Sequence, residues 1–326
     1  MDSNTAILPL ITVGITAYNA EETIEVAVES ALAQNWKPKE ILIVNDSSTD
    51  RTGEILDALA LKFPDIRVIH HPENKGVAGA RNTIIREAKG IFLAFFDDDD
   101  RSDPMRLDKQ YLRIVSYEEK YAGIREVICH CSRIQHYPDG SEHYEPTAGT
   151  KEDGLCPRGE AMAKRILYGL PVENGFGSMA SCSQMARLST YQTLDGFDED
   201  FRRCEDTDFN VRFAQNGGHF AGIAEPLVHQ TMTSGNDKTL TQDEDYYRKL
   251  IIKHAIFIRN SGVSPLFCSR WLDAKYAYLR GKKGLFVWKM IKLFFKYPLL
   301  TYRRMKWAWP NKKFNKHAQE FYKSFS

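Results

Sequence analysis

Three kinds of segment are missing from this sequence of 326 residues, and each absence argues against a class of protein. No run of 18 uncharged apolar residues occurs, which argues against a membrane-spanning helix. The first apolar stretch follows Asp2 and no basic residue, so we expect no signal peptide. The six cysteines lack the paired CxxC spacing of a zinc site, so we expect reduced thiols in the cytoplasm.

Glycine is also missing where many nucleotide-binding sheets need it. The first apolar run continues as ITAYNAEE (residues 15–22), which contains neither glycine nor a basic residue. A dinucleotide-dependent oxidoreductase would carry GxGxxG at this point, and a sugar nucleotidyltransferase would carry a glycine-rich, basic phosphate loop. The sequence therefore argues against both enzyme classes, although the nucleotidyltransferase shares the α/β layout described next.

The first half of the chain alternates between two hydrophobic periods. Short β-branched runs are separated by stretches of helical period, which predicts βαβαβαβ with a mostly parallel, Rossmann-like sheet flanked by helices. The predicted strands are 11–15, 41–44, 66–69 and 91–96, and the predicted helices are 21–33, 52–62 and 77–88. We expect an α/β domain over 1–242, with residues 1–110 binding a nucleotide and 111–242 binding an acceptor.

Charge is distributed unevenly along the chain. From Arg270 to Ser326 there are 15 Lys or Arg but only Asp273 and Glu320, whereas the formal charge of the whole chain is +1. We therefore expect a basic helical extension over 243–326 on an acidic body.

Polar residues follow the predicted strands, and the most acidic group is Asp97, Asp98, Asp99 and Asp100. Ligands of such sheets bind beyond the carboxyl ends of the strands. Crowded carboxylates there repel one another unless a cation joins them, and Mg²⁺ or Mn²⁺ prefers oxygen ligands of this kind. The alternative is a solvated acidic turn that caps the following helix.

Four motifs, in order and spacing, resemble those of glycosyltransferase family 2. They are TAYN at 16–19, VNDSSTD at 44–50, NKGVAGARN at 74–82 and FFDDDDRSDP at 95–104. The resemblance covers residues 8 to about 230. It implies the GT-A fold and an inverting enzyme that uses a nucleotide sugar and a divalent metal.

The resemblance also implies roles for individual residues. Those implied to bind the nucleotide sugar are Thr16, Tyr18, Asn19, Asp46, Arg81 and Asp98. Those implied to hold Mn²⁺ or Mg²⁺ are Asp97 and Asp99, with His229 as a further candidate. The alternatives are an Asx turn for Asp46, a surface helix charge for Arg81 and a packed strand histidine for His229.

The pair Glu205 and Asp206 matches the family's ED motif, in which the aspartate resembles the general base for the acceptor hydroxyl. The alternative is an acidic first turn that complements the dipole of the next helix, the role we assign to Asp208. The QxxRW element of processive relatives is missing, because DFNVRFAQNGG follows instead. We therefore expect the addition of a single sugar.

The basic extension contains one segment with an amphipathic pattern. Lys282, Lys289, Lys292 and Lys296 fall on one helical face, and Leu285, Val287, Trp288, Ile291, Phe294 and Phe295 cover much of the rest. This pattern is typical of a helix that lies on an anionic membrane surface. The alternatives are packing on the enzyme body or another subunit, and nucleic acid, which we do not expect to be a partner.

Together these features predict a transferase that moves a sugar from a UDP-linked donor to a glycan or lipid-linked acceptor. We expect it in surface polysaccharide assembly, peripheral on the cytoplasmic face of the cell membrane. The rivals are a sugar nucleotidyltransferase and a catalytically inactive, membrane-bound module that binds nucleotide sugars.

Overall fold

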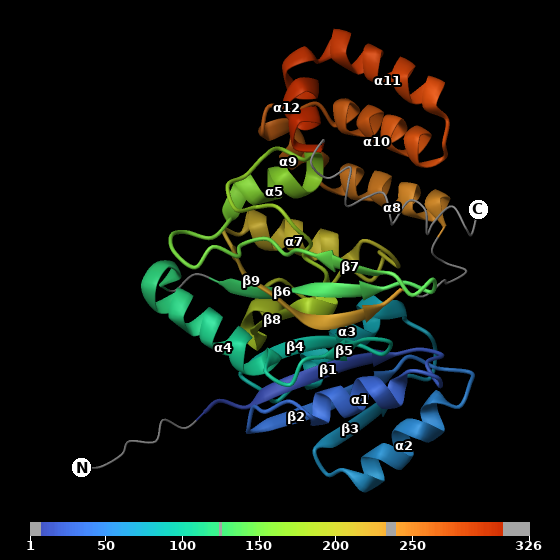
Figure 1. Cartoon of the computed structure of the whole chain (residues 1–326), viewed down its shortest axis with the longest axis vertical. Helices are drawn as coiled ribbons and strands as arrows, with labels where there is room; N and C mark the ends of the chain where they lie inside the picture. Colours follow the sequence, from blue (N-terminus) through green and yellow to red (C-terminus); the bar gives the residue numbers. More distant parts are fainter. Residues whose placement is uncertain (1–7, 124–125, 233–238, 309–326) are drawn as a thin grey trace.

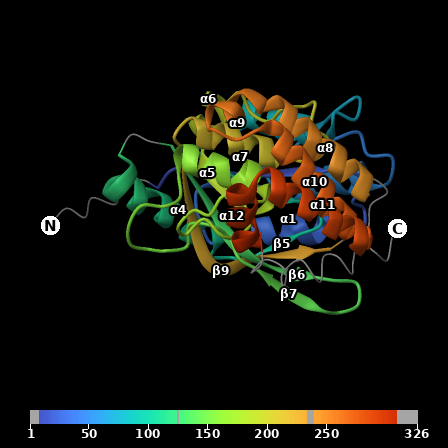
Figure 2. The ribbon, with the colours of Figure 1, turned by 90° about the horizontal axis from the view of Figure 1, so that it is seen from above.

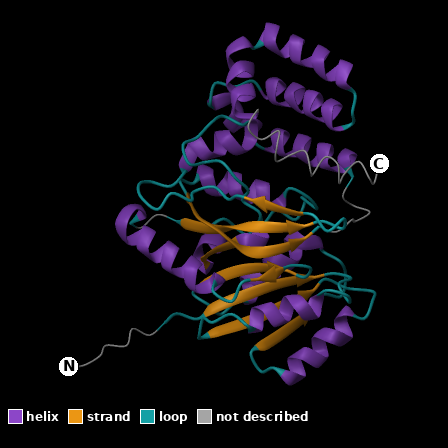
Figure 3. Cartoon of the chain, in the orientation of Figure 1, coloured by secondary structure: helices purple, strands orange, loops and turns teal. Residues whose placement is uncertain are grey.

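The computed structural model describes residues 8–123, 126–232 and 239–308. Within these residues nine strands form one sheet in the order β3-β2-β1-β4-β8-β6-β9-β5, with β7 paired to β6 (Figures 1 and 3). The first four strands are parallel, as predicted. They are β1 (Ile11–Ala17), β2 (Lys39–Asn45), β3 (Ile66–His70) and β4 (Phe92–Asp97).

The helices that connect these strands explain why the strands are almost wholly apolar. They are α1 (Ile24–Leu32), α2 (Thr52–Lys62) and α3 (Gly76–Glu87). Every β1 side chain except Thr16 is buried, as expected for a strand covered on both faces. A Cβ on Gly14 would lie 2.5 Å from Cγ2 of Ile84, so α3 packs closely on β1 only because this residue is glycine.

The second half of the sheet is mixed, and it contains strands that the hydrophobic pattern did not predict. Its strands are β5 (Arg101–Ser102), β6 (Val127–His136), β7 (Glu142–Glu145), β8 (Gln184–Arg187) and β9 (His219–Thr231). Its helices are α4 (Arg106–Tyr117), α5 (Gly159–Tyr168), α6 (Leu188–Thr193) and α7 (Glu205–Gln215). Strand β9 was missed because Pro226 interrupts its pattern at a register shift opposite Ser132.

The C-terminal segment is helical, as predicted, and packs on the body. It comprises α8 (Leu240–Lys253), α9 (Ala255–Asn260), α10 (Pro265–Leu279), α11 (Lys283–Lys296) and α12 (Pro298–Ala308). Figure 2 looks onto these helices, with α10 and α11 side by side. Phe267 and Tyr276 of α10 share a buried cluster with Tyr168 of α5 and Val211 of α7. The predicted domain boundary at residue 243 falls inside α8, and residues 309–326 lie outside the described part.

Asp208 ties α7 to α8 and does more than complement a helix dipole. Its fully buried carboxylate lies 2.8 Å from Nε of Arg212, 2.8 Å from Nζ of Lys253 and 2.9 Å from Nε2 of His254. Burial alone would raise the pKa of Asp208, but hydrogen bonds from His254, Lys253 and Arg212 lower it well below its usual range. The sequence interpretation of Asp208 was therefore incomplete, because its partners lie up to 46 residues away.

Candidate active site

The carboxyl ends of the parallel strands bring the first motifs together. Thr16 of β1 is in register with Val44 of β2 and with Asp97 of β4. The backbone N–H of Tyr18 donates to Oδ2 of Asp98 over 2.9 Å. Residues of three of the predicted motifs therefore lie at one edge of the sheet, where ligands of such folds bind.

The loops after β1 and β2 are hydrogen-bonded to each other. The N–H of Asn19 donates to Oγ of Ser48, and the N–H of Thr49 donates to Oδ1 of Asn19. Asn19 and Ser47 both have positive φ, 49° and 62°, a conformation that costs energy for residues other than glycine. Both residues lie in the loops at the rim of the site, where Tyr18 is 49% exposed.

Asp46 is buried, and its carboxylate holds the start of α3. Oδ1 accepts from the N–H of Lys75 at 2.9 Å, and Oδ2 accepts from the N–H of Gly76 at 2.7 Å. Nδ1 of His71 lies 2.7 Å from Oδ1. A carboxylate at a helix N-terminus satisfies free N–H groups and complements the helix dipole. Its contact with a nucleotide stays a prediction.

Arg81 joins the donor motif to the ED motif. Its Nη1 donates to Oε1 of Glu205 at 2.6 Å, and its Nη2 lies 3.3 Å from Oδ1 of Asp97. Burial lowers the pKa of Arg81, but Glu205, Asp97 and Asp206 more than compensate and raise it. Burial and the charge of Asp206 raise the pKa of Glu205 to about 7, and the charge of Arg81 opposes this shift. Arg81 thus fixes two carboxylates, and its contact with a donor stays a prediction.

Asp206 lies in the first turn of α7. The preceding Cys204 has a φ of 62°, a left-handed conformation that is uncommon for cysteine and starts the helix sharply. Oδ1 of Asp206 accepts from the N–H of Thr207 at 2.6 Å and from its Oγ1 at 3.1 Å. Oδ2 accepts no hydrogen bond from the described residues, so it is available to a ligand in the adjoining cavity.

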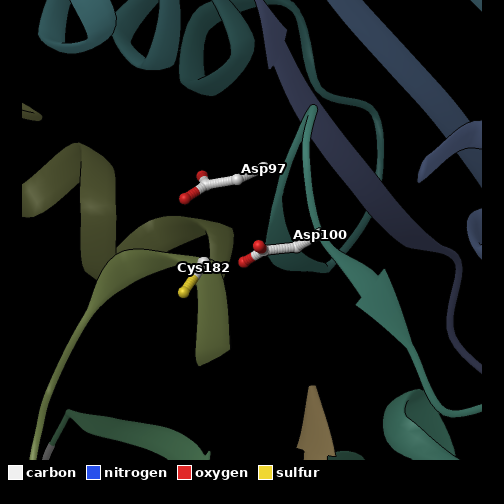
Figure 4. Close-up of side chains that lie close together, drawn as sticks. All are labelled: Asp97, Asp100 and Cys182. Carbon is white, nitrogen blue, oxygen red and sulfur yellow. The ribbon is translucent and has the colours of Figure 1, made fainter. Parts of the chain in front are cut away.

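The acidic cluster after β4 divides into a buried and a more exposed part. Ligand atoms of Asp97, Asp100 and Cys182 lie within 4.8 Å of one another (Figure 4). Asp100 is only 5% exposed, its Oδ1 accepts from the N–H of Thr231, and its buried Oδ2 has no hydrogen-bond partner among the described residues. The sequence interpretation paired Asp97 with Asp99, which does not belong to this group.

The chemistry of these side chains suits a hard divalent cation at the more exposed part. Burial and the charges of Asp99 and Asp97 raise the pKa of Asp98 to about 8, as expected for a buried carboxylate beside other carboxylates. Burial also raises the pKa of the Cys182 thiol, which Arg133 contacts at 3.3 Å. A neutral thiol is a poor ligand for Mg²⁺ or Mn²⁺. Asp97 and Asp99 are half-buried, and their ligation of such an ion stays a prediction.

His229 lies on β9, opposite Arg101 of β5. Its Nδ1 is 3.0 Å from Nε2 of His136, and the two rings stack. Burial and the charge of Arg101 lower the pKa of His229. His229 does not belong to the group of Asp97, Asp100 and Cys182, and its role as a metal ligand stays a prediction.

A cavity of about 560 Å³ lies between the end of β4 and the start of α7. Arg81, Asp97, Glu205 and Asp206 line it, together with residues that the sequence did not single out. Among the latter are Arg165 of α5, Arg203, and Asp243 and Tyr247 of α8. A carboxylate at the end of β4 and a second at the start of α7 thus face one space that is large enough for a small ligand.

This fold and this site define a glycosyltransferase of the GT-A type. The chain resembles residues 1–349 of TarS from S. aureus, whose crystal structure holds UDP-GlcNAc, with a TM-score of 0.59. The match covers 87% of this chain and 80% of that one at 16% identity, and at this identity it supports the fold alone.

The family follows from sequence relatives. The family model described as glycosyl transferase family 2 matches residues 12–160. EpsE of Bacillus subtilis, named as a glycosyltransferase, is 30% identical over 222 residues, which are 67% of this chain and 72% of EpsE. The chain belongs to glycosyltransferase family 2, as the motifs predicted.

A second relative is similar over a shorter stretch. It is WfaP of Escherichia coli, named as a UDP-Glc:α-D-GlcNAc-diphosphoundecaprenol β-1,3-glucosyltransferase. It is 46% identical over 95 residues, which are 28% of this chain. The matched part spans about a third of that relative, 36% of its length.

Proposed function

We propose that this chain transfers a single sugar from a UDP-linked donor to a glycan or lipid-linked acceptor, with inversion at the anomeric carbon. The observation that carries the proposal is the cavity that Asp206 shares with Asp97. The names of WfaP and of the TarS complex, which include a UDP sugar, support the choice of donor. Assembly of a surface polysaccharide is the proposed setting.

The geometry suggests a separate role for each of these residues in sugar transfer. Thr207 holds Oδ1 of Asp206, so Oδ2 is oriented to accept a proton from an acceptor hydroxyl. Arg81 pairs with the carboxylates of Glu205 and Asp97 and so fixes the start of α7 relative to the end of β4. Asp97 and Asp99 are the proposed ligands of Mg²⁺ or Mn²⁺, which would offset the negative charge of a departing diphosphate. Attack by the hydroxyl in one displacement inverts the anomeric centre.

The experiment that tests this function is a transfer assay with UDP-, GDP- and CMP-linked sugars, with and without Mn²⁺. We expect UDP release above background hydrolysis only with a UDP-linked sugar, Mn²⁺ and a glycan acceptor pool together. UDP release that does not depend on the acceptor, or release of another nucleotide, would contradict the proposal. Mass spectrometry of the product, expected to gain one sugar, tests the addition of a single residue.

We also propose that α11 and α12 dock on an anionic membrane at the cytoplasmic face. No helix in the described part of the chain is both long enough and apolar enough to cross a bilayer. Neither α11 nor α12 contains Asp or Glu, and large apolar side chains on them remain exposed. They include Trp288 (52%), Phe294 (50%), Phe295 (84%) and Leu299 (62%). Lysines at head groups beside inserted aromatics are typical of interfacial helices.

Replacing Phe295 by serine tests this docking. Full burial of such a side chain is worth roughly 2 kcal/mol, so we expect affinity for vesicles with anionic lipid to fall at least about tenfold. The measurement is co-sedimentation at low and high salt. The matched control is Leu61→Ser, because Leu61 is 91% exposed on α2, far from α11 in Figure 1. Equal binding by both variants would contradict the proposal.

A further inference from the structure

Arg165 is a cation of the cavity that the mechanism above does not use. It lies on α5, donates from Nη2 to the carbonyl of Gly177 at 2.6 Å, and its buried Nε has no hydrogen-bond partner within the part of the chain that the structure describes. No carboxylate among the described residues forms an ion pair with it. Burial lowers the pKa of Arg165 to about 10, so it is still charged at neutral pH. A partly buried charge without a counter-ion is costly unless a ligand supplies one.

Arg203 lines the same cavity as Arg165, and Lys275 contacts the wall of this cavity at Tyr247. Nζ of Lys275 on α10 lies 4.4 Å from the ring centre of Tyr247, which lines the same cavity as Arg165. Burial lowers the pKa of Lys275, and Asp243 opposes this shift. Nη2 of Arg203 is 3.8 Å from Oδ1 of the same Asp243. The basic cluster is defined as Arg165, Arg203 and Lys275, and Arg165 is the member for which the described residues provide no carboxylate partner.

The basic cluster shares no residue with the proposed donor corner, which is defined as Asp97, Asp98 and Asp99 after β4. Asp97 and Glu205 are already paired with Arg81, so they do not neutralise Arg165. Arg203 precedes Asp206 by three residues in the segment that enters α7. An anion on the basic cluster would thus lie in the cavity that contains the proposed base, whereas the carboxylates after β4 repel anions unless a metal is present.

We propose that the basic cluster binds a phosphate or diphosphate group of the acceptor, and so holds an acceptor hydroxyl near Asp206. Guanidinium groups bind phosphate oxygens through paired, charge-assisted hydrogen bonds, and Arg165 and Arg203 both offer such groups to the cavity. The inference rests on the proposed function, since it names the acceptor class for that same cavity. The phosphate could belong to a lipid diphosphate or to a soluble sugar phosphate, and the two sources are separated below.

Binding of inorganic pyrophosphate without metal, measured by titration calorimetry, tests the cluster. Without a cation the donor corner repels anions, so bound pyrophosphate reports on the basic cluster. We expect Arg165→Gln to weaken binding roughly 10- to 100-fold, the usual effect of losing hydrogen bonds to a charged group, and Arg165→Lys to retain part of the affinity. Arg259→Gln is the matched control, because Arg259 is exposed on α9 outside the cavity.

Three outcomes decide the inference, and two more identify the source of the phosphate. Unchanged affinity in a folded Arg165→Gln variant, or no binding by the wild type, would overturn it. Loss in Arg165→Gln with full affinity in Asp99→Asn supports it, because the second substitution alters only the donor corner. Farnesyl diphosphate that binds at least about tenfold more tightly than pyrophosphate assigns the site to a lipid diphosphate, and equal affinity assigns it to a soluble phosphate. Binding of UDP with Mn²⁺ is measured separately, so its failure counts against the proposed function alone.

Discussion

Asp206→Asn is expected to lower kcat for sugar transfer by about 10²- to 10⁴-fold, the usual contribution of a general base. Asparagine keeps an oxygen that can accept from the N–H and Oγ1 of Thr207, which hold the native carboxylate. The side chain should therefore stay in place while losing the ability to take a proton. Binding of UDP-linked sugar should be unchanged, because Asp206 is assigned to the acceptor side.

The measurement is steady-state transfer together with donor binding by titration calorimetry. Asp195→Asn is the matched control, because Asp195 is an exposed carboxylate that does not line the cavity and its φ of 57° is one that asparagine tolerates. We expect this variant to transfer sugar at the wild-type rate. Normal turnover by Asp206→Asn would remove Asp206 from the role of base.

Asp99→Asn is expected to abolish the Mn²⁺-dependent increase in thermal stability that a UDP-linked sugar gives the wild type. A ligand at about 100 times its Kd stabilises a folded protein by about 2.7 kcal/mol, which corresponds to several degrees in Tm. Loss of a carboxylate ligand weakens metal binding. Without the metal, the carboxylates at the end of β4 repel the donor's diphosphate. The measurement is a melting curve with UDP, GDP and CMP sugars, each with and without Mn²⁺.

Asp100→Asn separates the two candidate ligand sets. Asp100 is 5% exposed and accepts from the N–H of Thr231, so we interpret it as part of the support beneath the site. Asparagine can still accept from Thr231 and removes one charge from the crowded carboxylates, so the replacement should not lower the Tm of the free protein and should leave the donor-dependent increase intact. The reverse pattern, with the increase lost in Asp100→Asn and kept in Asp99→Asn, would assign the metal to the group of Asp97, Asp100 and Cys182.

The parallel half of the fold could be predicted from sequence because its signals are local. Strands 66–69 and 91–96 were placed within one residue at each end, since a strand buried on both faces is a continuous apolar run. The ED motif and the four aspartates were also found, because each follows a clear change in hydrophobic period. The family assignment rested on those local motifs.

The parts that could not be predicted depend on residues far apart in the chain. Arg81 was assigned to the donor, but its shortest contact is with Glu205, 124 residues later. Arg165 could not be singled out from the sequence, because nothing distinguishes it from other basic residues before the fold places it on the cavity. A cation without a counter-ion can be recognised only once its neighbours are known, which is why the sequence missed the basic cluster.

The contribution of α8 to the cavity has a consequence for engineering this enzyme. Asp243 and Tyr247 of α8 help to enclose the space beside the proposed base, and Lys253 anchors the same helix to Asp208. A minimal catalytic fragment cut at residue 242 would lack that wall and would expose Phe201 and Val211 to water. The shortest fragment worth expressing therefore extends beyond Lys253, and a chimera that exchanges only the first 242 residues would take Asp243 and Tyr247 of the cavity wall from the other parent.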